Sequence, residues 1–317
     1  MTLEHLQKKL WEIINLNRVL MYHKPVMLHQ CIDALNIRRD GVYVDVTFGG
    51  GGHSAEILKH IPQGKLFAFD QDPDAMTNHP GNENLTLIQQ NFRYMINYLR
   101  FYDAIPVDGI LADLGISSHQ IDVPERGFAT RYNSLLDMRM DQKGSRSAAD
   151  ILNNASIEEM ARIFKQYGEL KNGYPLAKRI ATAREEHPVD TTDRLNEIAT
   201  PLSGQKNANK YLAQVYQALR IEVNDELGAL KDLLYQAEKA LKPGGTLVIM
   251  SYHSLEDRLV KNFLKSGNFE GKQEKDFFGN PMVPFKTIKN KPITADEKEI
   301  EENPRSRSAR LRIGIKL

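Results

Sequence analysis

The sequence predicts an α/β protein built on a parallel, doubly wound sheet that a helical insertion interrupts. Between residues 28 and 113, short β-rich runs alternate with helical segments, which is the rhythm of a parallel sheet. No clear strand follows between about residues 126 and 224. The run TLVIMSY, which comes after Lys242-Pro-Gly-Gly245, then returns the chain to the sheet.

The first half of the chain supplies most of the predicted sheet. Residues 1–22 are expected to form an amphipathic helical extension, because apolar residues recur there at helical spacing and charges interrupt any signal-peptide-like centre. Strands are expected over 42–48, 65–70, 85–88 and 107–113, and helices over 28–36, 54–60, 73–78 and 92–101.

The insertion reads as helical throughout. Ser156 and Glu159 form a capping box that opens a helix running to about Gly168. Further helices are expected over 175–186, 191–200 and 208–240. We therefore assign residues 126–224 to an insertion, and residues 23–125 and 225–317 to the domain that contains the sheet.

The C-terminal part is more basic, with fourteen Lys and Arg against eight Asp and Glu over residues 258–317. Residues 268–290 are expected to form a long loop. Thr294 and Glu297 suggest a capping box for a short acidic helix, and the run SARLRIGIKL predicts a last strand.

Composition limits the classes of function. At 317 residues with a net charge of +1, the molecule has no overall field toward nucleic acid, so any such surface must be local. Cys31 is the only cysteine; it excludes an intrachain disulfide and suits a reducing cytoplasm, and we expect it to be a small buried apolar residue. No segment is apolar enough to span a membrane.

The stretch VYVDVTFGGGGHS carries the main functional signal. A short strand breaks into four glycines, and a helix is expected to begin near Ser54, so bare backbone and free N–H groups would face a ligand. Asp70 ends the next strand about twenty residues later, the usual place for an acid that holds ribose hydroxyls. A glycine-rich turn between two core elements is the alternative, and the spacing to Asp70 disfavours it.

The choice of nucleotide depends on the details of that turn. A dinucleotide site would place glycine at Ser54, so the fit is imperfect. The pattern Asp45-x-Thr47-x-Gly49-x-Gly51 instead resembles the cofactor loop of S-adenosylmethionine-dependent methyltransferases. Their ligand carries an ammonium, a sulfonium and a ribose diol, for which carboxylates are suitable partners.

Nine blocks of sequence, in order, resemble the bacterial 16S ribosomal RNA cytosine-N4 methyltransferases. They are FGGGGHS, AFDQDPDA, DGILADLGISS, ERGF, LDMRMD, QALRIEVNDELGAL, LKPGG, SYHSLEDR and NPRSRSARLR. The resemblance runs from about His23 to the C-terminus. Two departures stand out: His119 replaces the family's usual proline, and ATRYNSLLD replaces its SFxxDGPLD block, beside the expected substrate entrance.

This resemblance implies a seven-stranded Rossmann-like methyltransferase sheet with a helical insertion that forms the RNA-substrate part. It implies S-adenosylmethionine as methyl donor and, as target, the exocyclic N4 amine of a cytidine in the decoding region. The partner would be 16S ribosomal RNA in the small subunit or a late precursor, not DNA or a membrane, and the compartment the cytoplasm.

The family's site residues map onto this chain one position at a time. The implied cofactor-binding residues lie in the glycine loop and after the three strands that follow it; they are Gly51, Gly52, His53, Asp70, Phe92, Asp113 and Gln120. The implied catalytic candidates are Asp113 and His253. Asp113 could accept a proton from the target amine or only bind the donor, and His253 could lie near the cytidine or make a structural hydrogen bond.

Other candidates are weaker. Asp137 and Asp141 could meet the base or form an ion-pair network with the intervening arginine, and Arg305, Arg307 and Arg310 could contact phosphates. No metal-ligand spacing occurs, so we predict no metal. Two rival readings are a nicotinamide-dependent oxidoreductase and a non-catalytic ribosome-assembly factor with the same fold.

Overall fold

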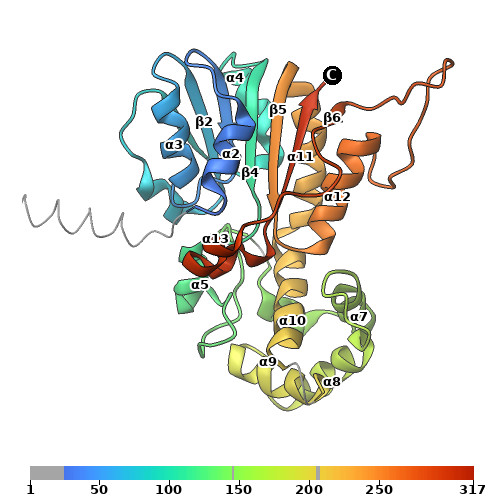
Figure 1. Cartoon of the computed structure of the whole chain (residues 1–317). Coiled ribbons are helices and arrows are strands. Elements are labelled where there is room, and N and C mark those ends of the chain that lie inside the picture. The colour runs from blue at the N-terminus through green and yellow to red at the C-terminus, as the bar shows by residue number, and fades with distance from the viewer. Residues whose placement is uncertain (1–24, 145, 205–207) are drawn as a thin grey trace, which may run out of the picture.

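The computed structural model describes residues 25–144, 146–204 and 208–317, so the expected N-terminal helix lies outside the described residues. Seven strands form one sheet within this part, in the order β3-β2-β1-β4-β5-β7-β6. The first five are parallel, and β7 runs antiparallel to both neighbours. Figure 1 shows helices on both faces of this sheet and a helical lobe below it. The predicted α/β doubly wound class is confirmed.

The sheet strands closely follow the predicted runs. Their bounds are β1 Val42–Asp45, β2 Lys65–Asp70, β3 Leu85–Gln89, β4 Val107–Asp113, β5 Leu241–Ser251, β6 Phe285–Thr287 and β7 Arg310–Lys316. The expected loop over 268–290 is partly wrong, because it contains β6. That three-residue strand is too short to give a periodic signal, and only its pairing with β7 defines it.

Alternating side chains divide the domain core between the two faces of the sheet. On β2, Phe67 and Phe69 belong to one buried cluster, while Leu66 and Ala68 belong to the other. The covering helices are α2 Leu28–Leu35 and α3 Gly52–His60 on one face, and α4 Met95–Phe101, α11 Glu226–Ala240 and α12 Ser254–Ser266 on the other. Cys31 is fully buried, as expected.

Shorter elements connect the strands at their carboxyl ends. These are η1 Pro73–Asn78, η2 Phe92–Tyr94, α5 Ser118–Asp122 and η3 Pro124–Arg126. The segment 73–78, expected as a helix, is a 3-10 helix with Pro73 at its start. Near the C-terminus lie α13 Glu297–Glu302 and η5 Pro304–Ser308. The cap of α13 is Asp296 and not the expected Thr294, because the Asp296 carboxylate accepts the Glu299 N–H.

The helical lobe has its own core between residues 128 and 219. Its helices are α6 Ala148–Asn154, α7 Ile157–Gln166, α8 Gly173–Glu186, α9 Thr192–Ala199, η4 Thr200–Leu202 and α10 Ala208–Asn224. Figure 1 shows them beyond the end of the sheet from which α5 emerges, which is the carboxyl end of β4.

One expected helix, over 208–240, is in fact two. The chain breaks at Asp225, whose φ of 46° is left-handed, and α11 begins at Glu226. Asp225 is held there by the Arg93 guanidinium at 2.6 Å. Asn224 next to it accepts the Met140 N–H and donates to the Met138 carbonyl, both at 2.8 Å. The break thus joins the lobe to the sheet domain.

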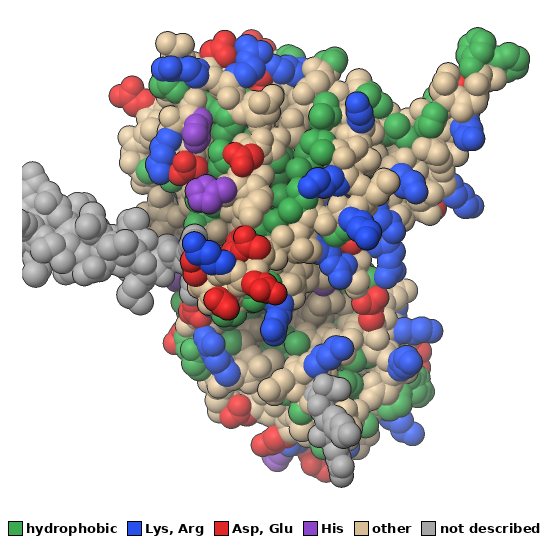
Figure 2. Space-filling view, viewed as in Figure 1, with side chains coloured by type: hydrophobic (Ala, Val, Ile, Leu, Met, Phe, Trp, Pro, Cys, Tyr) green, Lys and Arg blue, Asp and Glu red, His purple; other side chains and the backbone are tan. Residues whose placement is uncertain are grey.

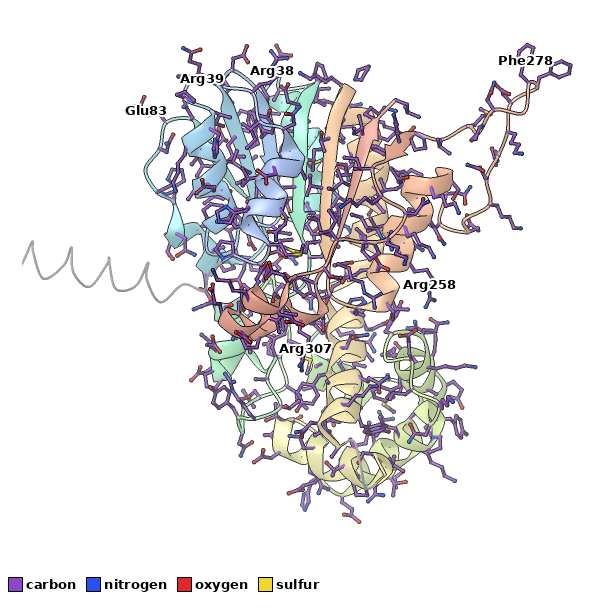
Figure 3. All side chains as sticks on the ribbon, in the orientation of Figure 1. Arg38, Arg39, Glu83, Arg258, Phe278 and Arg307 are labelled. Atoms are coloured by element: carbon purple, nitrogen blue, oxygen red, sulfur yellow. The ribbon has the colours of Figure 1, made fainter. Side chains whose placement is uncertain are left out.

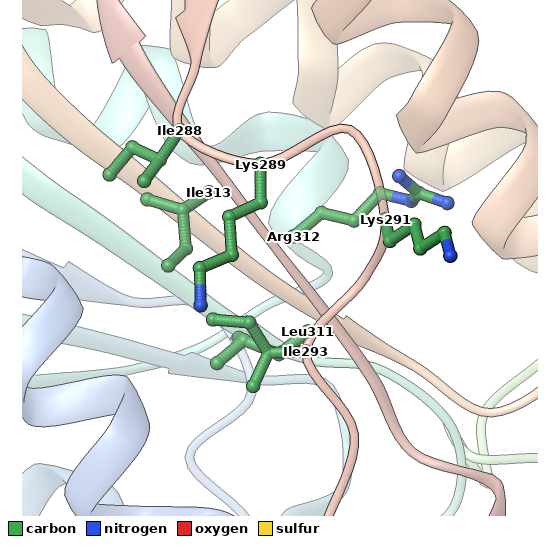
Figure 4. A pocket seen from close by; sticks show the side chains of 7 residues that line it. All are labelled: Ile288, Lys289, Lys291, Ile293, Leu311, Arg312 and Ile313. Atoms are coloured by element: carbon green, nitrogen blue, oxygen red, sulfur yellow. The ribbon is translucent and has the colours of Figure 1, made fainter.

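The outer edge of the sheet is closed by the segment after β6. Figure 4 shows Ile288, Lys289 and Ile293 crossing over Leu311 and Ile313 of β7. The hollow beneath them measures ≈ 10 Å³, about enough for one water molecule. No described helix is both long and apolar enough to cross a membrane.

Candidate active site at the carboxyl edge of the sheet

The glycine turn after β1 is built by backbone contacts. The Phe48 N–H donates to the Phe69 carbonyl at 2.9 Å, and the Gly51 N–H returns to the Phe48 carbonyl at 2.7 Å. Gly49 has a φ of +50°, and a Cβ there would lie 4.0 Å from the Ser117 Cβ and the Thr47 carbonyl oxygen, which is ordinary contact. At Gly52, a Cβ would come within 2.2 Å of Pro25. Gly49 is therefore favoured by its left-handed backbone, whereas Gly52 is required by packing.

Asp70 ends β2 directly beside this turn. Its Oδ2 accepts the Gly49 N–H at 2.8 Å, and its Oδ1 accepts the Asp72 N–H at 2.9 Å. Burial raises the pKa of Asp70 to about 6, against the lowering effect of those two donors. Each carboxylate oxygen keeps a further lone pair, so two adjacent hydroxyl groups could still donate to it.

Asp113 ends β4 and faces two side chains from other elements. Its Oδ1 accepts the Tyr252 hydroxyl at 2.7 Å, and its Oδ2 lies 3.9 Å from His53 Nδ1. The other nitrogen of His53 lies 3.1 Å from the Val26 carbonyl. Burial raises the pKa of Asp113 to about 6, although His53 and the bond from Tyr252 act in the opposite direction. A carboxylate with this pKa is suited to accept a proton near neutral pH.

Asp45, the third acid at a strand end, has a structural position. It is 1% exposed, its Oδ2 accepts the Ser54 hydroxyl at 2.7 Å, and its Oδ1 accepts the Thr47 N–H at 3.1 Å. These bonds tie the end of β1 to the first turn of α3. The Thr47 hydroxyl in turn accepts the Asp113 N–H at 2.7 Å. Asp45 therefore holds the turn that carries the glycines and orients Asp113 through Thr47.

Phe92 and Gln120 complete the set that the resemblance assigns to the cofactor. Phe92 opens η2 directly after β3 and is partly buried against the sheet core. Gln120 is 4% exposed; its Nε2 donates to Asp72 at 2.7 Å, and its Oε1 accepts the Ser117 N–H at 3.0 Å. The predicted cofactor residues thus lie at the ends of β2 and β4 and in the turns and helices that directly follow β1, β3 and β4. Their contacts with a ligand stay predictions.

Arg126 is a residue that the sequence reasoning did not single out. Its side chain is 8% exposed and contacts the Asp72 and Asp74 carboxylates at 2.8 and 3.0 Å. It also donates to the carbonyls of Arg139 and Met140. Arg126 therefore clamps the loop after β2 to the start of the lobe. Tyr252 was missed as well. In the sequence, the ERGF and SYH blocks were the only features that could have pointed to Arg126 and Tyr252.

Negative charge dominates this edge of the sheet. Asp45, Asp70, Asp72 and Asp113 lie here; among the described residues, Arg126 pairs with Asp72, and His53 lies 3.9 Å from Asp113. A pyrophosphate would be repelled by this set, whereas a ligand with an ammonium and a sulfonium would be attracted. The carboxylates at this edge and the glycine turn beside them fit S-adenosylmethionine.

His253 caps α12 next to this edge. Its side chain is 8% exposed, its Nδ1 accepts the Glu256 N–H at 3.4 Å, and its Nε2 lies 3.2 Å from Glu256 Oε1. These are the contacts of a structural cap, so its catalytic assignment stays a prediction. Glu226, His253 and Glu256 are the one described group whose spacing could hold a metal ion, but the Arg220 guanidinium already bonds both Glu226 oxygens, at 2.8 and 3.0 Å.

The weaker candidates are engaged elsewhere. Asp137 pairs with Arg139 at 2.6 Å, as an ion-pair network requires, and Asp141 accepts a local N–H in a turn. The three predicted phosphate-binding arginines differ in whether an acid pairs with them. Arg305 pairs with Asp122 and Arg310 with Asp257, while Arg307 is exposed. Figure 3 shows Arg307 at the level where the sheet domain meets the lobe.

The strand order and the acid-rich edge define a Rossmann-like methyltransferase domain. The chain belongs to the MraW methylase family, whose model matches residues 20–317. It is 55% identical to the ribosomal RNA small subunit methyltransferase H of Flavobacterium johnsoniae, over 93% of this chain and 98% of that protein. The protein of the same name from Parabacteroides distasonis is 53% identical, over 93% and 98%.

A solved rRNA methylase from Streptococcus thermophilus aligns over 92% of this chain and 95% of its own, with a TM-score of 0.41 and 13% identity. At that score the likeness adds nothing to the fold defined by the strand order.

Proposed function

We propose that this chain transfers a methyl group from S-adenosylmethionine to the N4 amine of a cytidine in 16S ribosomal RNA, in the decoding region of the small subunit. Two relatives that it matches almost end to end are named as small-subunit ribosomal RNA methyltransferases. The choice of N4 and of the decoding region comes from the nine blocks of motif resemblance.

The observation that carries the proposal is the Asp113 carboxylate at the end of β4. One of its oxygens is fixed by Tyr252, and the other faces His53 at 3.9 Å. The lone pair on cytosine N4 is conjugated into the ring, so the amine needs an acceptor for one of its protons as it attacks. The new bond joins N4 to the methyl carbon, the sulfur keeps the electrons of the broken C–S bond, and Asp113 takes the proton.

Asp70 and the glycine turn have a different role in this proposal. Asp70 would accept the two ribose hydroxyls of the donor, and the glycine turn beside it would let the donor approach the backbone closely. The acids at this edge would balance the ammonium and the sulfonium. The same charge disfavours the rival nicotinamide-dependent oxidoreductase, because its cofactor carries a pyrophosphate.

The lobe would form the other wall of the RNA cleft. Its helices lie beyond the carboxyl end of β4 (Figure 1), and Arg126 ties the loop after β2 to its first residues. A paired and stacked N4 cannot reach a buried methyl group in line, so the target cytidine is extruded and enters between the lobe and the sheet.

The test is a methylation assay on small subunits from a strain that lacks this protein. The purified chain and labelled S-adenosylmethionine should produce N4-methylcytidine at one position, identified by nucleoside mass spectrometry and a base-resolution map. Methylation of a carbon or a ribose hydroxyl would overturn the N4 assignment. Calorimetry with S-adenosylmethionine and with NAD distinguishes a methyltransferase from a nicotinamide-dependent oxidoreductase. The methylation assay excludes a non-catalytic assembly factor, because such a factor would produce no methylated nucleoside.

A further inference from the structure

A slender finger, residues 268–284, projects from the end of α12 and returns into β6 (Figure 1). Its tip carries Phe277 and Phe278, which are 98% and 85% exposed. Their rings meet edge to face, with centroids 5.6 Å apart. Figure 3 shows Phe278 at the far end, away from every other part of the described chain. Two neighbouring phenylalanines this exposed are unusual, because burying an aromatic side chain is favourable.

The tip is held in one shape by Asp276. Its Oδ1 accepts the N–H groups of Phe278 and Asn280 at 2.9 and 2.8 Å, and its Oδ2 accepts the Asn280 amide at 3.0 Å. The Asp276 N–H also donates to the Asn280 carbonyl at 2.9 Å. The two rings are therefore presented by a defined turn, so little ordering of the chain is needed before they contact a partner.

A row of cations leads from the finger along α12. Arg258, Lys261 and Lys265 are exposed and spaced i, i+3 and i+7, which places them on one face of the helix. Both acids of α12, Glu256 and Asp257, are buried, so every exposed charge on this helix is positive. Figure 2 shows Lys and Arg side chains gathered around α12, on the right-hand side of this face.

The row continues at both ends of α12. At its start, a groove of ≈ 360 Å³ separates α12 from the lobe, and Lys165 and Lys171 line it together with Arg258. At its end, Lys275 lies on the finger itself. We call these six residues the basic track: Lys165, Lys171, Arg258, Lys261, Lys265 and Lys275. Glu169 bonds Arg258 at 3.3 Å, whereas none of the five lysines forms an ion pair within the described residues.

We propose that the basic track and the finger form a second RNA-binding surface, with phosphates along the track and an unpaired base stacked on Phe277 or Phe278. The inference rests on the proposed function, because it assumes a ribosomal RNA substrate. Exposed cations that neutralise phosphates release condensed counterions from the RNA, and aromatic side chains stack on any exposed base. The whole chain carries only +1, so this gathering of cations is local.

This surface would raise the affinity for RNA without taking part in the methyl-transfer step. The finger projects from the side of the sheet domain, away from the carboxyl edge that holds Asp70 and Asp113, and the other end of the track lies at the groove between α12 and the lobe (Figure 1). A small subunit or a long RNA could contact the carboxyl edge and the finger at once. The second contact would raise the overall affinity of the protein for that RNA. S-adenosylmethionine binding should not depend on it.

The test measures binding of the full chain to a labelled fragment of 16S RNA and, separately, to S-adenosylmethionine. Replacing both tip residues, Phe277→Ala with Phe278→Ala, should weaken RNA binding about tenfold, the scale of losing one stacked base. The matched control is Phe101→Ala, which removes another aromatic side chain that is 80% exposed. All three side chains are exposed, so the variants should fold.

Charge reversal tests the track. Lys261→Glu with Lys265→Glu should weaken RNA binding and make the slope of log affinity against log salt shallower by about 1.4, that is about 0.7 for each lost phosphate contact on a single strand. Lys65→Glu with Lys239→Glu is the control, since both lysines are exposed on other elements, β2 and α11. Donor affinity should be unchanged in every variant.

The outcomes are separable. If the wild-type chain methylates subunits but the tip and track variants bind RNA like the controls, this inference is wrong and the proposed function stands. If the variants lose affinity only for assembled subunits, or dissociate a dimer of this chain, the finger meets protein and the RNA assignment is overturned. If the wild-type chain methylates no RNA, the proposed function fails first.

Discussion

The carboxyl edge of the sheet and the basic track are opposite solutions to holding a charged ligand. At the edge, Asp45 is buried and Asp70 and Asp113 are partly buried, and each accepts hydrogen bonds from the protein. Along the track, lysines are exposed, and no described residue forms an ion pair with them. Burying a carboxylate is costly, and its pKa rises in consequence, whereas an exposed lysine costs almost nothing. Substitutions at the edge should therefore have large effects that depend on pH, whereas substitutions on the track should have small effects that depend on salt.

The largest effect should come from Asp113→Asn, which keeps the size of the side chain but removes its charge. If Asp113 accepts the amine proton, single-turnover methyl transfer should fall about a hundredfold or more, the usual scale for a positioned acid–base group. Donor affinity, measured by calorimetry, should be nearly unchanged.

Two other results would change the role of Asp113. A fall in donor affinity that parallels the fall in rate would make it a ligand of the donor's ammonium group. Full rate together with full affinity would show that Asp113 neither accepts the proton nor binds the donor. The carboxyl edge would then depend on Asp70 for its main effect.

The next effect concerns Asp70→Ala. Losing a charged partner for two hydroxyls should weaken S-adenosylmethionine binding by about 1.5–3 kcal/mol, or roughly ten- to hundredfold in Kd. The fold should survive, because the side chain bonds only the local N–H groups of Gly49 and Asp72. Calorimetry measures the affinity, and thermal unfolding is the control for the fold. Unchanged affinity would remove the ribose assignment.

Acid should weaken donor binding while leaving the track intact. The pKa of Asp70 is raised to about 6. The ionised Asp70 carboxylate binds the donor, so affinity is retained above pH 6 and lost as the pH falls through it. Protonation of Asp70 should lower affinity about tenfold at pH 5. Calorimetry from pH 5 to 8 checks this. RNA binding by the lysine track should stay nearly constant over this range. A parallel loss of RNA affinity would show that the two regions do not differ in their response to pH.

The sequence predicted the edge of the sheet better than the track. Period-two runs and the glycine turn placed Asp70 and Asp113 at strand ends, because both signals are local in the chain. Arg126 and Tyr252 could not be found in this way. Their partners, Asp72 and Asp113, are distant in sequence and meet them only after the loops and strands assemble.

The same limit explains the errors in the fold. The break at Asp225 lies inside an unbroken helical pattern, and it depends on Arg93, more than a hundred residues earlier. The short strand β6 exists only through its pairing with β7. Likewise, the expected loop over 268–290 gave no sign that Asp276 would order its tip, since this needs a turn that brings Asn280 back to it.

The smallest expected effect, and the sharpest test of how the edge is organised, is Tyr252→Phe. The Tyr252 hydroxyl donates to Asp113 at 2.7 Å, and this bond lowers the pKa of Asp113. Its loss should therefore raise that pKa further, by about one unit. The single-turnover rate should then fall only about twofold at pH 7 but about tenfold at pH 5, and it should recover by about pH 9, because Asp113 is then ionised again. A merely structural loss would lower the rate equally at every pH. The matched control is Tyr43→Phe, whose hydroxyl accepts the Arg38 N–H at 2.8 Å near the start of β1. An unshifted acid limb in the rate profile of Tyr252→Phe would show that Asp113 titrates independently of its neighbour, and proton acceptance would then depend on Asp113 and His53 alone.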